Sequence, residues 1–192
     1  MNLGIDISNN NGHIDWDLLG RTGVTLAMVK VSEGARFVDE FAATNILGAK
    51  RAGMLVGAYH YALPSAGDPL REVDHFQACL SVLPEVDLTA LDLEDPAILT
   101  GVNLSQWATT WLSEAELATA HTPRLYSSRW YIATHHLNDI VNATRYKLWL
   151  AAWTSAEPPS VAPWKSLDGW QFAAGVAWPG VKAVDLSLWA YR

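Results

Sequence analysis

The stretch TSAEPPSVAPWKSLDGWQFAAGVAWPG, residues 154–180, decides how this chain can fold. Its first part, 154–167, contains three prolines, which a regular helix cannot accommodate. A strand-like run precedes this part at 146–153, and another follows it at 168–173. A third run, at 181–187, follows the whole stretch. The connection 174–180 is about seven residues long, shorter than the roughly ten to twelve that a parallel crossover needs. We therefore expect the last two strands to form an antiparallel hairpin.

Upstream of this stretch, short apolar runs alternate with longer segments of helical periodicity, as in βαβ units. The expected strands lie at about 3–7, 25–31, 54–61, 87–94 and 123–127. The expected helices lie at about 15–22, 39–52, 69–83, 103–120 and 130–137. The sequence thus predicts an α/β barrel of about five β/α units followed by three strands without helices. This plan fits 192 residues, whereas a full eightfold barrel needs about 250.

Length and composition limit the class of protein. With 192 residues, half of them apolar, we expect a single domain over 1–192 and a monomer. A net charge of −7 argues against nucleic acid and anionic membrane surfaces as partners. The chain shows no basic or apolar leader and no apolar run of about 18 residues, so we expect no signal peptide and no membrane span. Cys79, in an apolar helical pattern, is expected to be a buried thiol.

Polar and aromatic residues gather at the carboxyl ends of the expected strands. In an alternating β/α fold, these ends line the mouth at which substrates bind. The five ends are Gly4–Ser8, Lys30–Gly34, Ala58–Tyr61, Ala90–Pro96 and Leu125–Ser127. The sequence therefore predicts one mouth assembled from distant parts of the chain.

Asp92 and Glu94 carry the sharpest chemical signal. Because side chains alternate along a strand, Leu91 and Leu93 should face the helices while the two acids face the barrel axis. Their Cα atoms should lie roughly 6.6 Å apart, so that ionising one opposes ionising the other and raises a pKa. Glycosidic cleavage needs one carboxyl group to protonate the leaving oxygen and a second to support the oxocarbenium centre. We assign the first task to Glu94 and the second, or substrate orientation, to Asp92.

The alternative for Asp92 and Glu94 is a structural pair. They could bridge to Lys30 or Arg124, or cap the turn that follows the strand. The motif alone is compatible with a catalytic role and with a structural role for the two acids.

Asp6 and Asp185 are two further candidate acids, each between apolar neighbours. Closing a barrel brings its first and last strands together, so both side chains could approach the predicted mouth. An antiparallel last strand could also direct Asp185 elsewhere. Four other acids lie near expected helix starts and are assigned to helix stabilisation: Asp15, Asp17, Asp39 and Asp68.

The histidines do not indicate a metal site. The chain has neither an H-E-x-x-H pattern nor paired cysteines, and adjacent His135 and His136 cannot share a helix face. We expect no metal and no cofactor. His60, at a strand end, should either contact substrate or be a structural imidazole.

Eight segments, in order, resemble the family 25 glycoside hydrolases, the Chalaropsis-type lysozymes of bacteria, fungi and many phage endolysins. They are Gly4–Ser8, Val29–Gly34, Gly57–Tyr61, Asp92–Glu94, Leu125–Ser127, Leu148–Ala151, Trp170–Phe172 and Val184–Leu186. The resemblance covers essentially the whole chain and implies one catalytic domain over 1–192. Its fold would be a flattened, incomplete TIM-like barrel of about five β/α units and three strands lacking helices. The sequence departs at Ser187, where an Asn is common.

The resemblance implies a muramidase that cleaves the β-1,4 bond between N-acetylmuramic acid and N-acetylglucosamine of bacterial peptidoglycan, without a metal or cofactor. Matched by position, Glu94 is the catalytic acid, Asp92 its partner, and Asp6 and Asp185 supporting carboxylates. The residues expected along the sugar groove are Lys30, Glu33, Tyr59, His60, Tyr61, Tyr126, Trp149, Trp153 and Gln171.

Two alternatives belong to other functional classes: a wall-binding module without turnover, and a chitin-directed glycosidase. As a muramidase of the phage endolysin type, the protein would be made in the host cytoplasm and act on the wall after release. Secretion by another route is the alternative.

Overall fold

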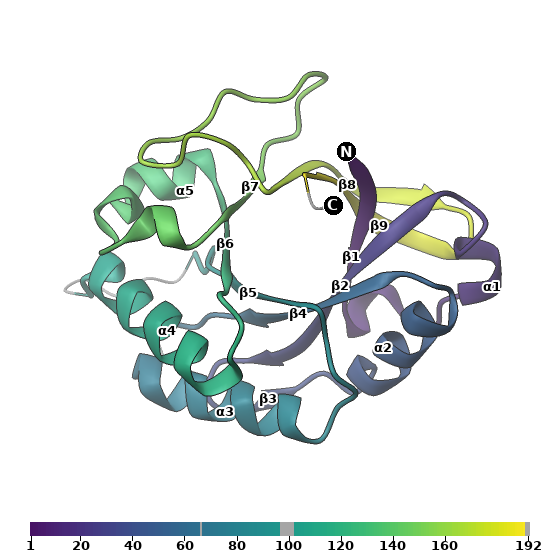
Figure 1. Ribbon diagram of the computed structural model, residues 1–192, viewed down its shortest axis with the longest axis horizontal. Helices are drawn as coiled ribbons and strands as arrows, with labels where there is room; N and C mark the ends of the chain where they lie inside the picture. The colour runs from purple at the N-terminus through teal and green to yellow at the C-terminus, as the bar shows by residue number, and fades with distance from the viewer. Residues whose placement is uncertain (66, 97–101, 191–192) are drawn as a thin grey trace.

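The computed structural model describes residues 1–65, 67–96 and 102–190 and has an α/β fold, with strands in a ring and helices outside it (Figure 1). The strands are β1 Asn2–Ile7, β2 Val24–Glu33, β3 Phe37–Val38, β4 Leu55–Tyr61, β5 Leu88–Asp92, β6 Arg124–Ser128, β7 Leu148–Ala151, β8 Gly169–Trp178 and β9 Val181–Trp189. The α-helices are α1 Trp16–Leu19, α2 Ala42–Arg51, α3 Pro69–Ser81, α4 Leu104–Thr119 and α5 Arg129–Thr134. Single 3₁₀ turns are η1 Asn9–Asn11, η2 Leu137–Asp139 and η3 Ala143–Arg145.

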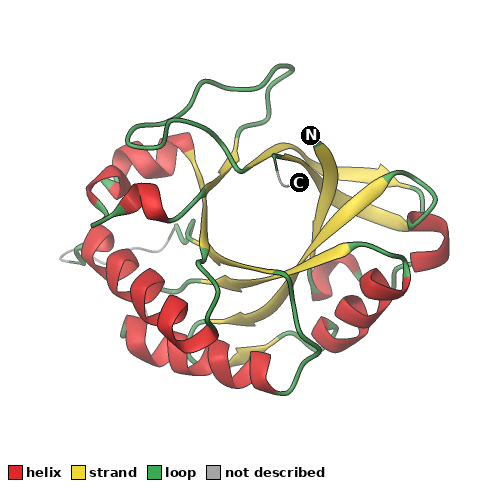
Figure 2. Ribbon diagram, viewed as in Figure 1, coloured by secondary structure: helices red, strands yellow, loops and turns green. Residues whose placement is uncertain are grey.

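The sheet closes into a barrel. Its strand order is β1-β9-β8-β7-β6-β5-β4-β2-β3, and β1 also pairs with β2, so eight strands form the ring and β3 is an outer addition. Each of β1, β2, β4, β5 and β6 is followed by an α-helix, which confirms the expected five β/α units. No helix of the described residues follows β7, β8 or β9, and Figure 2 shows the segment that joins β7 to β8 as a loop.

The hairpin of β8 and β9 is antiparallel, as predicted, but its connection is much shorter than expected. The strands continue to Trp178 and resume at Val181, so the turn is Pro179-Gly180 instead of 174–180. The pairing shifts register between Ala173 and Val176, and Gly175 there has φ of +65°. These irregularities break the period-two pattern, which concealed the second half of β8.

Other elements differ less from their predicted bounds. Two-residue β3 is too short to leave a periodic signal and was not predicted. Helix α1 spans four residues where 15–22 was expected. Strand β5 ends at Asp92, two residues before the expected end, although the Leu93 amide still donates to Tyr126 at 3.0 Å. None of the described helices is long and apolar enough to cross a membrane.

Expected structural roles are confirmed for Asp15, Asp39, Asp68 and Cys79, and Asn103 is a further helix cap. Asp15, Asp68 and Asn103 cap helices α1, α3 and α4 by accepting backbone N–H bonds. Asp39 accepts from the amides of Phe41 and Asn9, both at 2.8 Å. Cys79 is a free, buried thiol.

The interior of the barrel changes from apolar to polar along each strand. On β2 the inward side chains are Leu26, Met28 and then Lys30, and on β5 they are Leu88, Ala90 and then Asp92. Trp149 and Trp189 fill the apolar half, with ring centroids 5.0 Å apart. A packed floor therefore lies under a polar mouth at the carboxyl ends of the strands.

Candidate active site

A cavity of about 280 Å³ opens at this polar end of the barrel. It contains all four acids that the sequence singled out, contributed by β1, β5, the residues that follow β5, and β9. Its lining residues are Asp6, Ile7, Ser8, Asn10, Asn11, Lys30, Tyr59, Tyr61, Asp92, Glu94, Tyr126, Trp149 and Asp185.

Barrel closure brings Asp6 and Asp185 together. They are direct partners in the antiparallel pairing of β1 with β9, which answers the question of where the last strand directs Asp185. On β5, Leu91 and Leu93 pack in the outer core while Asp92 points inward, as the alternation predicts. Two pairs of acids thus face one another across a small cavity.

Gln171 connects the acids to the aromatic wall. Its Nε2 donates to Asp6 Oδ2 at 3.1 Å and to Asp185 Oδ2 at 3.3 Å. Its Oε1 accepts from the Tyr126 hydroxyl at 3.0 Å and from Trp153 Nε1 at 3.2 Å. Gln171 is buried behind the cavity and is not part of its lining, so its place is that of a positioning residue.

All four acids have raised pKa values. Burial, and next the charge of Asp185, raises the pKa of Asp6 to about 8. Burial, then Glu94 and Asp6, raises the pKa of Asp92 well above its ordinary value. Burial raises the pKa of Asp185 as well. These carboxyl groups therefore retain protons at a pH where free carboxyl groups are ionised.

Glu94 and Asp92 differ in exposure. Glu94 is exposed at the rim, where partial desolvation and then Asp185 raise its pKa while Lys30 lowers it. Asp92 lies deeper, with 7% of its surface exposed, and its Oδ1 has no hydrogen-bond partner among the described residues. The rim acid can meet a leaving group, and the deeper acid offers an unused acceptor to a ligand.

The structural alternative for the two acids finds little support. Lys30 makes its 2.6 Å ion pair with Glu33, and Arg124 makes a 2.7 Å ion pair with Asp168. Lys30 Nζ also lies 4.9 Å from the ring centroid of Tyr61. Lys30 acts on the acid pair as a nearby charge that lowers both pKa values.

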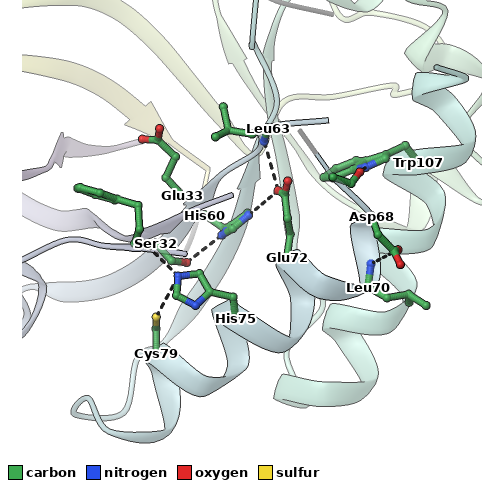
Figure 3. A network of polar contacts seen from close by, with 12 residues as sticks. Ser32, Glu33, His60, Leu63, Asp68, Leu70, Glu72, His75, Cys79 and Trp107 are labelled. Atoms are coloured by element: carbon green, nitrogen blue, oxygen red, sulfur yellow. Dashed lines mark hydrogen bonds and ion pairs between the residues drawn. The ribbon is translucent and has the colours of Figure 1, made fainter. Parts of the chain in front are cut away.

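His60 was expected among the substrate contacts, and its position contradicts this. Its side chain is fully buried on the outer face of β4, between Ser32 and Glu72, with both ring nitrogens in hydrogen bonds (Figure 3). The reason is the strand alternation: neighbouring Tyr59 and Tyr61 line the cavity, so His60 must face the helices. The other reading, a structural imidazole, is the correct one.

Two more expected groove residues lie outside the cavity lining. Glu33 belongs to a neighbouring hollow, and Trp153 stands above Gln171 with 69% of its surface exposed. Ser187, the position that departs from the family pattern, is buried and accepts from Trp149 Nε1 at 3.0 Å.

Ile7 and Ser8 belong to the predicted strand end Gly4–Ser8, but two further lining residues, Asn10 and Asn11, were not predicted from the sequence. The available signal was three consecutive asparagines directly after a strand end. Ser8 and Asn11 cap η1 reciprocally, and Asn11 Nδ2 donates to the Ala183 carbonyl at 2.7 Å, which fixes this loop beside β9.

The described side chains include no group of three or more His, Cys, Asp or Glu arranged to hold a metal ion. What the cavity offers is protonated and ionised carboxyl groups beside aromatic rings. Tyr126 and Trp149, with ring centroids 4.5 Å apart and ring planes tilted by 59°, give the cavity an aromatic side, and sugar rings pack on aromatic side chains. This arrangement is suited to acid-assisted cleavage of a glycosidic bond.

Comparison with known proteins agrees with this chemistry. The sequence pattern of the glycosyl hydrolases family 25 matches residues 5–181. Lysozyme M1 of Streptomyces globisporus is 28% identical over 183 residues, which are 89% of this chain and 61% of that protein. An autolytic lysozyme of Clostridium acetobutylicum is 35% identical over 91 residues, 47% of this chain and 28% of that protein.

Solved structures share the fold. A bacterial lysozyme from Streptomyces coelicolor superposes with a TM-score of 0.88 over 100% of this chain and 93% of that one, at 23% identity. At this identity the likeness concerns the fold alone. The chain spans 61% and 57% of the length of the first two curated relatives, the second being an uncharacterized protein of Escherichia coli O157:H7.

Proposed function

The chain belongs to family 25 of the glycosyl hydrolases, and from this premise we propose that it hydrolyses bacterial peptidoglycan as an N-acetylmuramidase. The bond cleaved is the β-1,4 bond between N-acetylmuramic acid and N-acetylglucosamine. The observation that carries the proposal is the convergence of Asp6, Asp92, Glu94 and Asp185 in one cavity with a tyrosine and tryptophan wall. We further propose that the protein acts as a monomer on the cell wall, after release from a host cell or after secretion by another route.

Glu94 is the general acid and base in this proposal. Its protonated carboxyl group donates a proton to the glycosidic oxygen while the bond from that oxygen to the muramic acid C1 breaks. The carboxyl oxygens around it stabilise the positive charge that develops at C1. A water molecule then adds to C1 and returns a proton to Glu94, which restores the enzyme. Its exposed place at the rim and its raised pKa support this role.

Asp92 orients the substrate or stabilises its charge. Its buried Oδ1 has no partner among the described residues, and leaving such an acceptor unpaired costs free energy. An N–H group of an acetamido sugar would pair with this oxygen. Asp6 on β1 and Asp185 on β9 both accept hydrogen bonds from Gln171. In this proposal they contribute to the electrostatic potential at the reacting sugar.

Analysis of the products tests the proposal. Purified peptidoglycan is digested, the new reducing ends are reduced with borohydride, and the fragments are identified by mass spectrometry. A muramidase leaves reduced muramic acid at every new end, and Glu94→Gln, the matched control, leaves almost none. Reduced glucosamine ends would contradict the assigned bond. Binding to the wall without new reducing ends would support a wall-binding module. Faster release of reducing ends from chitin than from peptidoglycan would support a chitin-directed enzyme.

A further inference from the structure

A second hollow, of about 440 Å³, opens at the same end of the barrel as the catalytic cavity. Its walls follow the carboxyl ends of β2 and β4, and the polar residues among them are Glu33, Arg36, Asp68, Arg71 and Glu72. Glu33 lines this hollow and bonds, at 2.6 Å, to Lys30, which lines the catalytic cavity. The two spaces therefore adjoin at the Lys30–Glu33 ion pair, and a substituent of a sugar in the cavity would be within reach of the hollow.

Two arginines of the hollow have no ion-pair partner among the described residues. Arg36, in the loop after β2, and Arg71, in the first turn of α3, are both exposed. Within residues 1–65, 67–96 and 102–190, neither has a carboxylate oxygen within 4.0 Å, whereas Arg145 pairs with Glu116 at 2.7 Å. A free guanidinium presents a fork of N–H donors that matches a carboxylate group.

Glu72 forms the floor of the hollow and is almost fully buried, with 1% of its side chain exposed. Its Oε2 accepts from the Leu63 amide at 3.2 Å and lies 2.9 Å from His60 Nε2 (Figure 3). Its Oε1 is buried and has no hydrogen-bond partner in the described part of the chain. The hollow thus combines cationic forks at its rim with an unused acceptor at its floor.

We propose that this hollow binds the short peptide that muramic acid carries in peptidoglycan, with Arg36 and Arg71 holding its carboxylate groups. A peptide supplies both groups that the hollow lacks, since it carries carboxylates for the arginines and N–H donors for Glu72. A neutral sugar would leave both guanidinium groups unpaired, and a long polyanion would meet Glu33 and Asp68. The inference rests on the proposed muramidase function, because the catalytic cavity must hold a muramic acid for its peptide to reach the hollow.

Binding to two glycan substrates tests this inference. Soluble peptidoglycan strands are prepared with their peptides and, after amidase digestion, without them. Glu94→Gln binds without cleaving, so its dissociation constants are measured alone and combined with Arg36→Gln and Arg71→Gln. We expect the two arginine changes to weaken binding of peptide-bearing strands on the order of tenfold, and of peptide-free strands less than about twofold.

A matched control separates recognition from overall charge. Arg21→Gln with Arg51→Gln, two exposed arginines outside both cavities, removes the same charge from the Glu94→Gln protein and should leave both dissociation constants unchanged. Equal weakening on both substrates, or none on either, overturns the peptide site. Wild-type turnover is read separately: absence of new reducing ends contradicts the muramidase function, while a selective arginine effect on binding still supports the hollow.

Discussion

The inner and outer faces of the barrel both hold buried titratable side chains, but their hydrogen bonding differs. On the outer face, His60 Nδ1 lies 2.8 Å from Ser32 Oγ and its Nε2 lies 2.9 Å from Glu72 Oε2. On the inner face, Asp92 has a buried oxygen with no partner among the described residues, and the pKa of Asp6 is raised to about 8. Neighbouring positions on the same sheet thus have satisfied and unsatisfied polar groups.

The contrast separates a structural polar group from a functional one. Burial lowers the pKa of His60, and its two hydrogen bonds satisfy the imidazole, so this group contributes to stability. On the inner face Gln171 donates to Asp6 and Asp185, but buried Asp92 Oδ1 has no partner among the described residues. The inner acids also oppose one another's ionisation, which lowers stability. A costly arrangement of this kind is expected where charge must be supplied to a substrate.

The largest effect is expected from a substitution on the inner face of the barrel. Glu94→Gln keeps the shape of the side chain but cannot donate the proton, so peptidoglycan hydrolysis should fall on the order of 10² to 10⁴-fold, measured as release of reducing ends. The Tm should stay close to that of the wild type. Glu114→Gln, an exposed residue of α4, is the control and should be fully active. Activity of Glu94→Gln within tenfold of the wild type would remove the acid assignment.

The next largest effect is expected from a substitution on the outer face of the barrel. His60→Ala leaves a cavity against Phe76 and Trp111 and removes a partner of buried Glu72, so the free energy of unfolding should fall by about 2–4 kcal/mol. Urea denaturation measures this loss. The kcat/KM of the folded protein should stay within about twofold of the wild type, because the imidazole faces away from the cavity. A large loss of kcat/KM at unchanged stability would instead place His60 in the site.

A smaller, pH-dependent effect sharpens the comparison. The pKa of Asp6 is about 8 in the folded protein and ordinarily 3.8, so folding retains a proton that the unfolded chain releases as the pH rises between these values. Stability is therefore lost through this window, and Asp6→Asn removes the loss. We expect the variant to gain at least about 2 °C in Tm at pH 8 and little at pH 4, measured by calorimetry. An equal effect at both pH values would contradict the raised pKa.

Much of the inner face was predictable because it depends on local periodicity. The alternation of Leu91, Asp92 and Leu93 predicted the inward acid, and the proline-rich 154–167 segment predicted the loss of helices after the fifth unit. Barrel closure predicted that Asp6 and Asp185 could meet, and the antiparallel register of β1 with β9 brings them together. These features follow from backbone geometry, which a sequence pattern reports directly.

The remainder depended on details that periodicity does not report. His60 lies at a strand end, as a substrate contact would, but it alternates with the inward-facing Tyr59 and Tyr61 and therefore faces the helices. The cavity-lining loop after β1 is fixed by reciprocal capping of η1, and the second hollow by loops after β2 and β4. Loop conformations arise from particular long-range contacts, such as that of Asn11 with Ala183. A single sequence does not reveal such contacts in advance.

The most direct test of the central claim is a pH titration of the side-chain carboxyl carbons by ¹³C NMR, with Glu94→Gln and Asp92→Asn used to assign the two signals. Our account predicts that both groups hold protons above their ordinary pKa values of 4.5 and 3.8, and that removing Glu94 lowers the pKa of Asp92. Two independent titrations at or below those ordinary values would contradict it.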